Sequence, residues 1–319
     1  MSSRRALPPE LRGTPFPVHE ALTAGVTPTR LRAADLESPF HGIRRPVTPL
    51  LPDTSDSDEL QRRRLAQLVS DCRSYLTRAD PAALFSHVTA ARLYRMPLPW
   101  ALETRPELDV AVLDPAHPPR RSGIVGHRLN AGSIAVTSIG GLPVPSAVDV
   151  WLQLGPLLSV KNLIIAADHL VRRKQPFTTL GTLHEAVDAL HRHRGAARLR
   201  AALPYIRSKT DSPAESRMRL ILIAAGLPEP VIGHTVYDKD GFFVGTPDLA
   251  YVGERIALDY EGEVHNRDAR VFGEDIERRE QFQDAGWRHI RVVKGHLAKP
   301  HRLVDRVSFA LAERRTSIR

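Results

Sequence analysis

The chain has a single cysteine, Cys72, among its 319 residues. One cysteine excludes an internal disulfide framework and is typical of a reducing compartment. A long hydrophobic run is also missing, because the longest apolar stretch, around residues 220–225, is far too short to span a bilayer. The first residues, MSSRRALPPELRG, contain no apolar segment of the kind found in secretory signals. We therefore expect a cytoplasmic protein with no membrane contact.

The formal net charge of +9 is unevenly distributed. Residues 1–210 contain 28 Lys and Arg against 18 Asp and Glu, or +10, whereas residues 211–319 contain 17 against 18, or −1. A long basic segment is typical of a nucleic-acid-binding surface, although a generally basic surface without such a partner also fits. We expect a polyanion to dock on the first two thirds of the chain.

The length suggests two or three domains, and the polar passage PDTSDSDELQRRR suggests a linker. We predict three domains, at residues 1–78, 79–210 and 211–319. The first shows a helix, a tight turn at Gly25, a second helix capped by Thr27 and a basic strand, which is the outline of a small winged helix. The candidates for phosphate contact in this domain are Arg30, Arg32, Arg44 and Arg45.

The middle domain mixes strands, such as LDVAVLD and GIVGHRLN, with helices, including one basic helix over residues 184–203. The last domain begins with a helix capped by Ser212, with Pro213 at its first position. Three antiparallel strands, a long polar helix over residues 269–285, the strand WRHIRVV and a basic helix follow. This order predicts an α/β sandwich.

Carboxylates are concentrated in the run TPDLAYVGERIALDYEGEVH. Asp259 and Glu261 point to one face of a strand, because side chains alternate along it. Asp248 lies on the preceding strand, across a turn, so two antiparallel strands can bring the three acids together. Oxygen-only ligands favour magnesium, manganese or calcium over zinc, and we expect Mg²⁺ or Mn²⁺ as the cofactor. An unpartnered charge inside the apolar strand RIALDYEGE would be costly, which makes Asp259 the hardest of these acids to explain structurally.

These motifs carry a family resemblance. The helix, the Pro247-Asp248 pair, the ten-residue gap to Asp259 and the GWRHIRV strand together resemble the PD-(D/E)xK nuclease superfamily. Within it, SPAESRMRLILIAAGLPEP and DIERREQFQDAGWRHIRVV resemble the flanks of a domain of unknown function related to very-short-patch-repair endonucleases. The resemblance covers residues 211–300. It implies metal-dependent hydrolysis of a phosphodiester in DNA.

By this resemblance, Asp248 and Asp259 are the metal-binding acids, joined by the Tyr260 carbonyl. Glu215 would reach the metal directly or through water. The sequence departs from the commonest pattern at Glu261, where lysine is more usual. Glu261 would instead act as a general base or bind a second metal, an acid variant known in the superfamily.

Two further residues of this run, Glu263 and His265, are peripheral candidates. His265 would donate a proton to the leaving oxygen or contact a phosphate. Arg278 and Arg291 are the cations of this region that we expect to contact DNA. Because a cut through both strands commonly needs two active sites, a homodimer is one arrangement open to the chain.

The first 210 residues resemble the AbiEi-type antitoxin region. The resemblance lies in ALTAGVTPTRLRAADLESPFHGIRRP and in SHVTAARLYRMPLP. It implies DNA binding by the amino-terminal part and, in some relatives, a partner toxin of nucleotidyltransferase type.

Several alternatives remain open. Glu215 completes a capping box with Ser212, Asp248 can cap a turn, and Glu261, Glu263 and His265 can be solvated strand-end residues. At the level of function, the main alternative is an AbiEi-type antitoxin or transcriptional regulator with an inactive nuclease-like domain. A third is a protein-interaction module with an acidic patch.

Overall fold

The computed structural model describes residues 6–47, 54, 56–191, 193–261 and 269–317. The protein is mixed α/β and divides into two compact units, Met1–Leu154 and Gly155–Arg319. The boundary predicted at residue 210 therefore lies inside the second unit. Among the described residues, no helix combines the length and the apolar character needed to cross a membrane.

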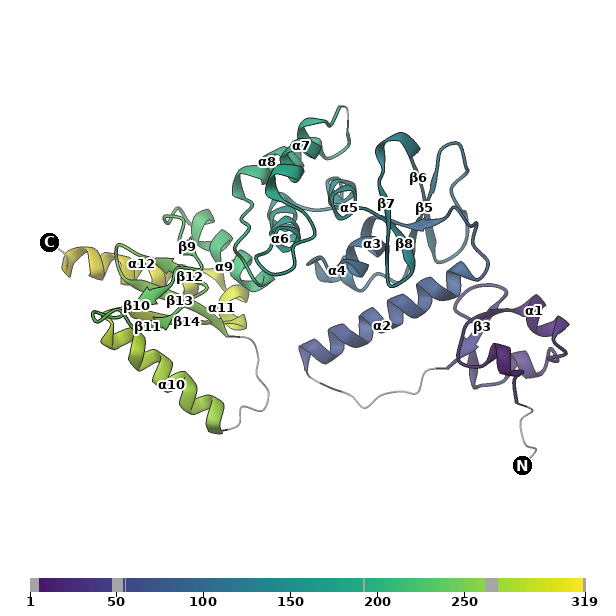
Figure 1. Cartoon of the computed structure of the whole chain (residues 1–319), viewed down its shortest axis with the longest axis horizontal. Coiled ribbons are helices and arrows are strands. Elements are labelled where there is room, and N and C mark those ends of the chain that lie inside the picture. The colour runs from purple at the N-terminus through teal and green to yellow at the C-terminus, as the bar shows by residue number, and fades with distance from the viewer. Residues whose placement is uncertain (1–5, 48–53, 55, 192, 262–268, 318–319) are drawn as a thin grey trace. The chain divides into compact units, whose positions relative to one another are not determined.

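The first unit combines small sheets with short helices and one long helix (Figure 1). Its strands form the sheets β1-β3-β2, β4-β5-β6 and β7-β8. Its elements are β1 (Phe16–Pro17), α1 (Val18–Thr23), β2 (Leu36–Glu37), β3 (Ile43–Pro46), α2 (Ser57–Leu76), β4 (Leu84–Phe85), α3 (His87–Leu93), α4 (Trp100–Glu103), β5 (Leu108–Leu113), β6 (Ile124–Leu129), β7 (Val136–Ile139), β8 (Leu142–Pro145) and α5 (Ala147–Leu154).

The second helix predicted near the amino terminus is only a 3₁₀ turn, Arg30–Arg32. The predicted cap residue Thr27 is replaced in that position by Thr29, although the Thr27 hydroxyl still accepts a hydrogen bond from the Arg30 backbone N–H at 3.2 Å. The turn ends at Arg32, and the next residue, Ala33, has an extended backbone conformation. Its apolar residue Leu31 packs into a small core with Phe16 and Ala21.

The middle strands β5 and β6 are confirmed and run parallel. Helix α3 begins after Ser86, whose side chain contacts the ring of His87 (Nδ1 to Oγ, 3.0 Å) instead of capping the helix. The His87 backbone is at φ 45°, which is unusual for a residue with a side chain. Its ring stacks on His127 at 3.7 Å between centroids, and His127 Nε2 lies 2.8 Å from the buried Asp109.

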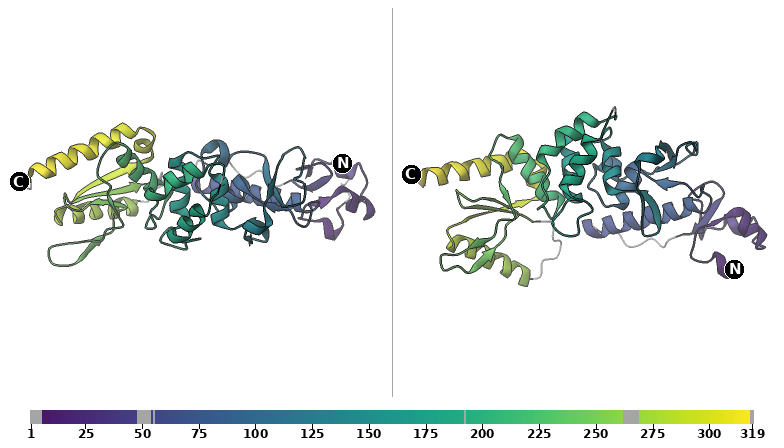
Figure 2. Two further views of the ribbon diagram at one scale, coloured as in Figure 1. Left: turned by 90° about the horizontal axis from the view of Figure 1, so that it is seen from above. Right: turned by 45° about the horizontal axis from the view of Figure 1, so that its top comes forward.

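The second unit begins with helices and ends in a sheet with helices around it (Figures 1 and 2). Its elements are α6 (Val160–Leu170), α7 (Leu180–Asp188), α8 (Ala196–Ala202), α9 (Pro213–Ala224), β9 (Val231–Ile232), β10 (Val236–Tyr237), β11 (Phe243–Gly245), β12 (Leu249–Tyr251), β13 (Ile256–Glu261), α10 (Ala269–Asp284), β14 (Arg288–Val293), α11 (Lys294–Ala298) and α12 (Pro300–Ser317).

The single basic helix predicted over residues 184–203 is wrong, because the structure has two helices there, α7 and α8. Gly195 precedes α8 at φ 92°, a conformation that favours glycine. A Cβ at this position would collide with the backbone of Gly155. Close approach of two chain segments therefore separates the helices.

The main sheet has the order β14-β13-β12-β9. Strand β13 is antiparallel to β12 and parallel to β14. On one face, Leu258 and Ile290 join a core with residues of α9 and α12. On the other, Ala257 packs with Phe282 of α10. Since side chains alternate along β13, Asp259 lies on the α10 side of the sheet.

Candidate active site

Asp248 and Asp259 are brought together by the register of two neighbouring strands. Leu249 of β12 pairs with Leu258 of β13, so the residues before and after them are opposite each other. The Asp248 backbone N–H donates to Asp259 Oδ1 at 3.0 Å, and the Tyr260 backbone N–H donates to Asp248 Oδ2 at 2.7 Å. The fold therefore places Asp248 and Asp259, two of the three strand acids expected to meet, next to each other.

Asp259 is held by two cationic or potentially cationic side chains. His289 Nε2 lies 2.7 Å from its Oδ2, and Arg278 Nη2 lies 3.3 Å from the same oxygen. The Phe282 ring supports both partners, stacking on His289 at 5.1 Å and lying 5.8 Å from the Arg278 guanidinium carbon. Burial alone would raise the pKa of Asp259, but the His289 hydrogen bond and the Arg278 charge outweigh it and lower that pKa.

Asp248 has the opposite electrostatic environment. Burial, together with the nearby negative charges of Glu215 and Asp259, raises its pKa to about 7, although the Tyr260 hydrogen bond opposes the shift. A carboxyl group perturbed this far by burial and like charge is a frequent mark of a functional site. The two aspartates of the pair therefore differ in protonation near neutral pH.

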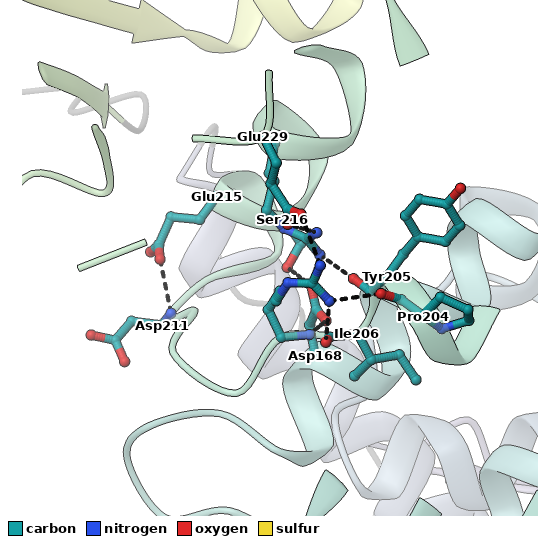
Figure 3. Close-up of polar contacts among 10 residues, drawn as sticks. Asp168, Pro204, Tyr205, Ile206, Asp211, Glu215, Ser216 and Glu229 are labelled. Atoms are coloured by element: carbon teal, nitrogen blue, oxygen red, sulfur yellow. Dashed lines mark hydrogen bonds and ion pairs between the residues drawn. The ribbon is translucent and has the colours of Figure 1, made fainter. Parts of the chain in front are cut away.

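Glu215 lies in the first turn of α9, where Ser212 caps the helix by accepting from the Glu215 backbone N–H at 3.2 Å. Its own carboxylate accepts from the Asp211 backbone N–H at 2.9 Å (Figure 3). The side chain is buried, and burial raises its pKa. Glu215 thus has two roles: it binds the backbone at the start of the helix, and its charge contributes to the raised pKa of Asp248.

Asp248, Asp259 and Glu215 are three of the residues predicted to bind a metal ion. Within the described ranges, no group of three or more His, Cys, Asp or Glu side chains is gathered closely enough to hold a metal ion. The donor types nevertheless fit a hard cation, since Asp248, Asp259 and Glu215 are carboxylates. Burial first, and then the charges of Glu215 and Asp259, raise the pKa of Asp248, and a divalent cation would offset both effects.

The remaining predicted site residues divide into two groups. Glu261 is half-buried at the end of β13 and forms an ion pair with Arg291 of β14. In the strand register, Arg291 lies opposite Asp259, two residues before Glu261. The two side chains therefore belong to the same strand face as Asp259. Glu263 and His265 lie outside the described residues.

Three of the four amino-terminal arginines predicted to contact phosphate have internal partners. Arg30 makes two hydrogen bonds to Asp35, at 2.9 and 2.7 Å. Arg44 donates to the Leu31 carbonyl at 2.8 Å. Arg45 is only 5% exposed and pairs with Glu37 and Asp71, so its position suits packing rather than phosphate contact. Arg32 is exposed.

Two residues near the acids were missed from the sequence. His289 shares a strand face with Arg291, but its pairing with Asp259 depends on the parallel β13–β14 register, which no local pattern reveals. Arg173 follows α6 and pairs with Asp211, and the charges of Glu215 and Asp248 also act to raise its pKa. A cation from outside residues 211–319 therefore borders the site.

A buried ion pair joins helix α9 to helix α6. Arg219 Nη2 lies 2.9 Å from Asp168 Oδ2, with the two side chains 0% and 1% exposed. Asp168 also accepts from Ser216 Oγ and from the Arg207 backbone N–H, both at 2.7 Å, while Arg219 donates to the Tyr205 carbonyl at 2.7 Å (Figure 3). This network fixes the helix that carries Glu215 against the preceding helices.

No protein-family model matches the chain. The uncharacterized protein Rv2248 of Mycobacterium tuberculosis strain H37Rv is 26% identical over 225 residues, covering 69% of this chain and 78% of that protein. The uncharacterized protein MT2308 of strain CDC 1551 matches to the same extent. Among solved structures, the RV2827C protein of the same species matches 70% of this chain and 83% of its own, with a TM-score of 0.36 and 13% identity. That structural similarity is too low to carry an argument.

Proposed function

We propose that this chain is a DNA-binding protein whose carboxy-terminal part hydrolyses phosphodiester bonds with the help of Mg²⁺ or Mn²⁺. The observation that carries the proposal is the geometry of the Asp248–Asp259 pair, in which the Asp248 N–H donates to Asp259 and the Tyr260 N–H donates to Asp248. Burial and the nearby charges of Glu215 and Asp259 also raise the pKa of Asp248 to about 7. The arrangement of the sheet, with helices on both faces, suits the α/β sandwich of PD-(D/E)xK nucleases. The basic charge of residues 1–210 supports DNA as the polyanion.

In this proposal, Asp248, Asp259 and the Tyr260 carbonyl would hold the cation, with Glu215 beside them. When bound, the metal would lower the pKa of a water molecule and polarise the phosphoryl oxygen. His289 and Arg278 orient Asp259 through its Oδ2 and keep it ionised. Arg278, which is 45% exposed, is also placed to face a phosphate at the entrance of the site.

The proposal is tested by incubating the full chain with plasmid, linear duplex and single-stranded DNA while Mg²⁺ or Mn²⁺ is titrated. We expect cleavage that disappears in EDTA and in Asp259→Asn, which keeps the shape of the side chain and removes its charge. Asp284→Asn, at the exposed end of α10, is the control and should cleave normally. Absence of product from the wild type at every metal concentration would overturn the proposed reaction.

A second function is favoured by one feature of the same site. The Asp259 oxygen that would face a metal already contacts His289 and Arg278, so side chains of the protein itself offset its charge. This pairing suits a DNA-binding regulator of AbiEi type in which the nuclease-like part is a scaffold, with a nucleotidyltransferase-type toxin as its partner. Such a protein would bind DNA equally well with and without metal and release no product.

A further inference from the structure

A cavity of about 810 Å³ lies along β14, the terminal strand of the described main sheet. Its walls come from α10, β14 and α12, which include Arg279, His289 and Phe309 respectively. Its volume falls within the range of roughly 300–1,000 Å³ that is typical of small-ligand sites. The space therefore suits a compact ligand or a single chain segment rather than a turn of duplex.

The charge of the cavity walls favours an anion. Four arginines line it against two acids: Arg279, Arg288, Arg306 and Arg314 against Asp305 and Glu313. Arg306 donates to the Arg291 carbonyl and Arg314 to the Gly286 carbonyl, each at 3.1 Å. Carbonyl groups orient these guanidinium groups without neutralising them, so the positive charge is held in place and stays available.

An aromatic ring is exposed within this basic wall. Phe309 is 65% exposed, which leaves a large apolar surface in contact with solvent. The guanidinium carbon of Arg288 lies 5.7 Å from its ring centroid. An exposed ring and a guanidinium plane are the two surfaces on which an unpaired base stacks, while neighbouring arginines contact its phosphate.

His289 belongs to both the cavity and the aspartate pair. It lines the cavity, and its Nε2 contacts Asp259. Its Nδ1 is buried and has no hydrogen-bond partner among the described residues. A ligand in the cavity would therefore lie one side chain away from Asp259.

We propose that this cavity binds an unpaired nucleotide of a single-stranded or frayed DNA strand, with the base on Phe309 and the phosphate among Arg279, Arg306 and Arg314. The class of substrate is thus a DNA strand with an unpaired nucleotide. This inference rests on the proposed function only in taking DNA as the polymer. A strand held here runs past His289 toward the acids. The site thus selects unpaired over fully paired DNA.

The test measures binding of the full chain to a fluorescent single-stranded oligonucleotide and to its duplex by anisotropy, in EDTA so that cleavage plays no part. Phe309→Ala should weaken single-strand binding about fivefold or more, because stacking of one base contributes roughly 1–3 kcal/mol. Phe309→Trp should restore it, and Arg306→Ala should also weaken it. Duplex binding should change less than about twofold.

Trp100 provides a matched control, since it is equally exposed and has the Arg64 guanidinium carbon 4.4 Å from its ring but lies in the other unit. Trp100→Ala should leave single-strand affinity unchanged.

Unchanged affinity in Phe309→Ala, or an equal loss for duplex, would overturn the nucleotide site. Conversion of a dimer to a monomer by Phe309→Ala in sedimentation would show a second copy as the occupant instead, and would also overturn it. Lack of cleavage by the wild type with Mn²⁺ would count only against the hydrolytic function.

Discussion

His289 Nε2 lies 2.7 Å from Asp259 Oδ2, across two parallel strands that are far apart in the sequence. The ring is 6% exposed and stacks on Phe282, so packing determines its orientation. This arrangement resembles the outer contacts that orient metal-binding carboxylates in other proteins. Asp259 is therefore held ionised and in one position by a residue that itself faces the cavity along β14.

Replacing His289 by alanine should weaken the metal site. Asp259 would lose the hydrogen bond that most lowers its pKa, so the carboxylate would bind Mn²⁺ less well. Loss of such an outer contact typically costs 10–100-fold in metal affinity. Isothermal titration with Mn²⁺ should show a loss of at least about tenfold, whereas His301→Ala on the exposed surface of α12 should bind like the wild type. Equal affinities for wild type and His289→Ala would contradict this role.

Asp248→Asn should stabilise the metal-free protein at alkaline pH. The folded-state pKa of about 7 is above the ordinary value of 3.8, so the folded state binds a proton that the unfolded state has released. The free energy of unfolding of the wild type therefore falls as pH rises from about 4 to about 7 and then levels off. The asparagine variant lacks this penalty, while its side-chain oxygen can still accept from the Tyr260 N–H.

Thermal melting in EDTA measures the difference. We expect Asp248→Asn to melt at least about 2 °C above the wild type near pH 8, with the gain vanishing near pH 4. Asp240→Asn, in an exposed turn, is the control. With Mn²⁺ at pH 8 the order should reverse, because only the wild type gains from binding. A gain that grows toward acidic pH has the wrong sign and would refute the mechanism.

Arg173 should matter for cleavage although it lies outside the region that resembles nucleases. Its guanidinium pairs with Asp211 and feels the charges of Glu215 and Asp248, so it borders the place where a phosphate would sit. A hydrogen bond to a charged group contributes about 1.5–3 kcal/mol, which corresponds to roughly tenfold to a hundredfold in rate. Single-turnover cleavage by Arg173→Gln should fall by that factor, and the exposed neighbour Lys174→Gln should cleave normally. Full activity in Arg173→Gln would exclude a contact with substrate.

The sequence predicted best what depends on local chemistry. The Ser212 cap, the helix after it, strand β13 and the Asp248–Asp259 meeting follow from capping, alternation and a short turn between adjacent strands. It could not predict the His289 contact, since that depends on the parallel β13–β14 register, nor Arg173, which lies in the segment after α6 and acts on Glu215 and Asp248 through its charge. Sequence alone also could not separate a surface arginine from Arg45, which is buried and pairs with Glu37 and Asp71, because both read as a basic residue in a small domain.

The buried pair of Asp168 and Arg219 should be the most sensitive ionic contact of the second unit. Asp168→Ala would remove the buried carboxylate that pairs with Arg219 and leave this 0% exposed side chain with only the partly exposed Glu229, at 3.0 Å, as a charged partner. Removing one member of a buried pair typically costs about 3–5 kcal/mol, because the other charge is left uncompensated. Chemical denaturation should show a loss of that order.

A double-mutant cycle distinguishes this pair from ordinary packing. Arg219→Met fills similar space without charge, so the combination of Asp168→Ala with Arg219→Met should lose less stability than the two single changes added together. The coupling should reach at least about 1 kcal/mol. Arg315→Met is the control, since its exposed side chain pairs with Glu254 at 2.9 Å outside this network. Strict additivity of Asp168→Ala and Arg219→Met would mean that the ion pair does not fix α9, and that Glu215 is held by its helix cap alone.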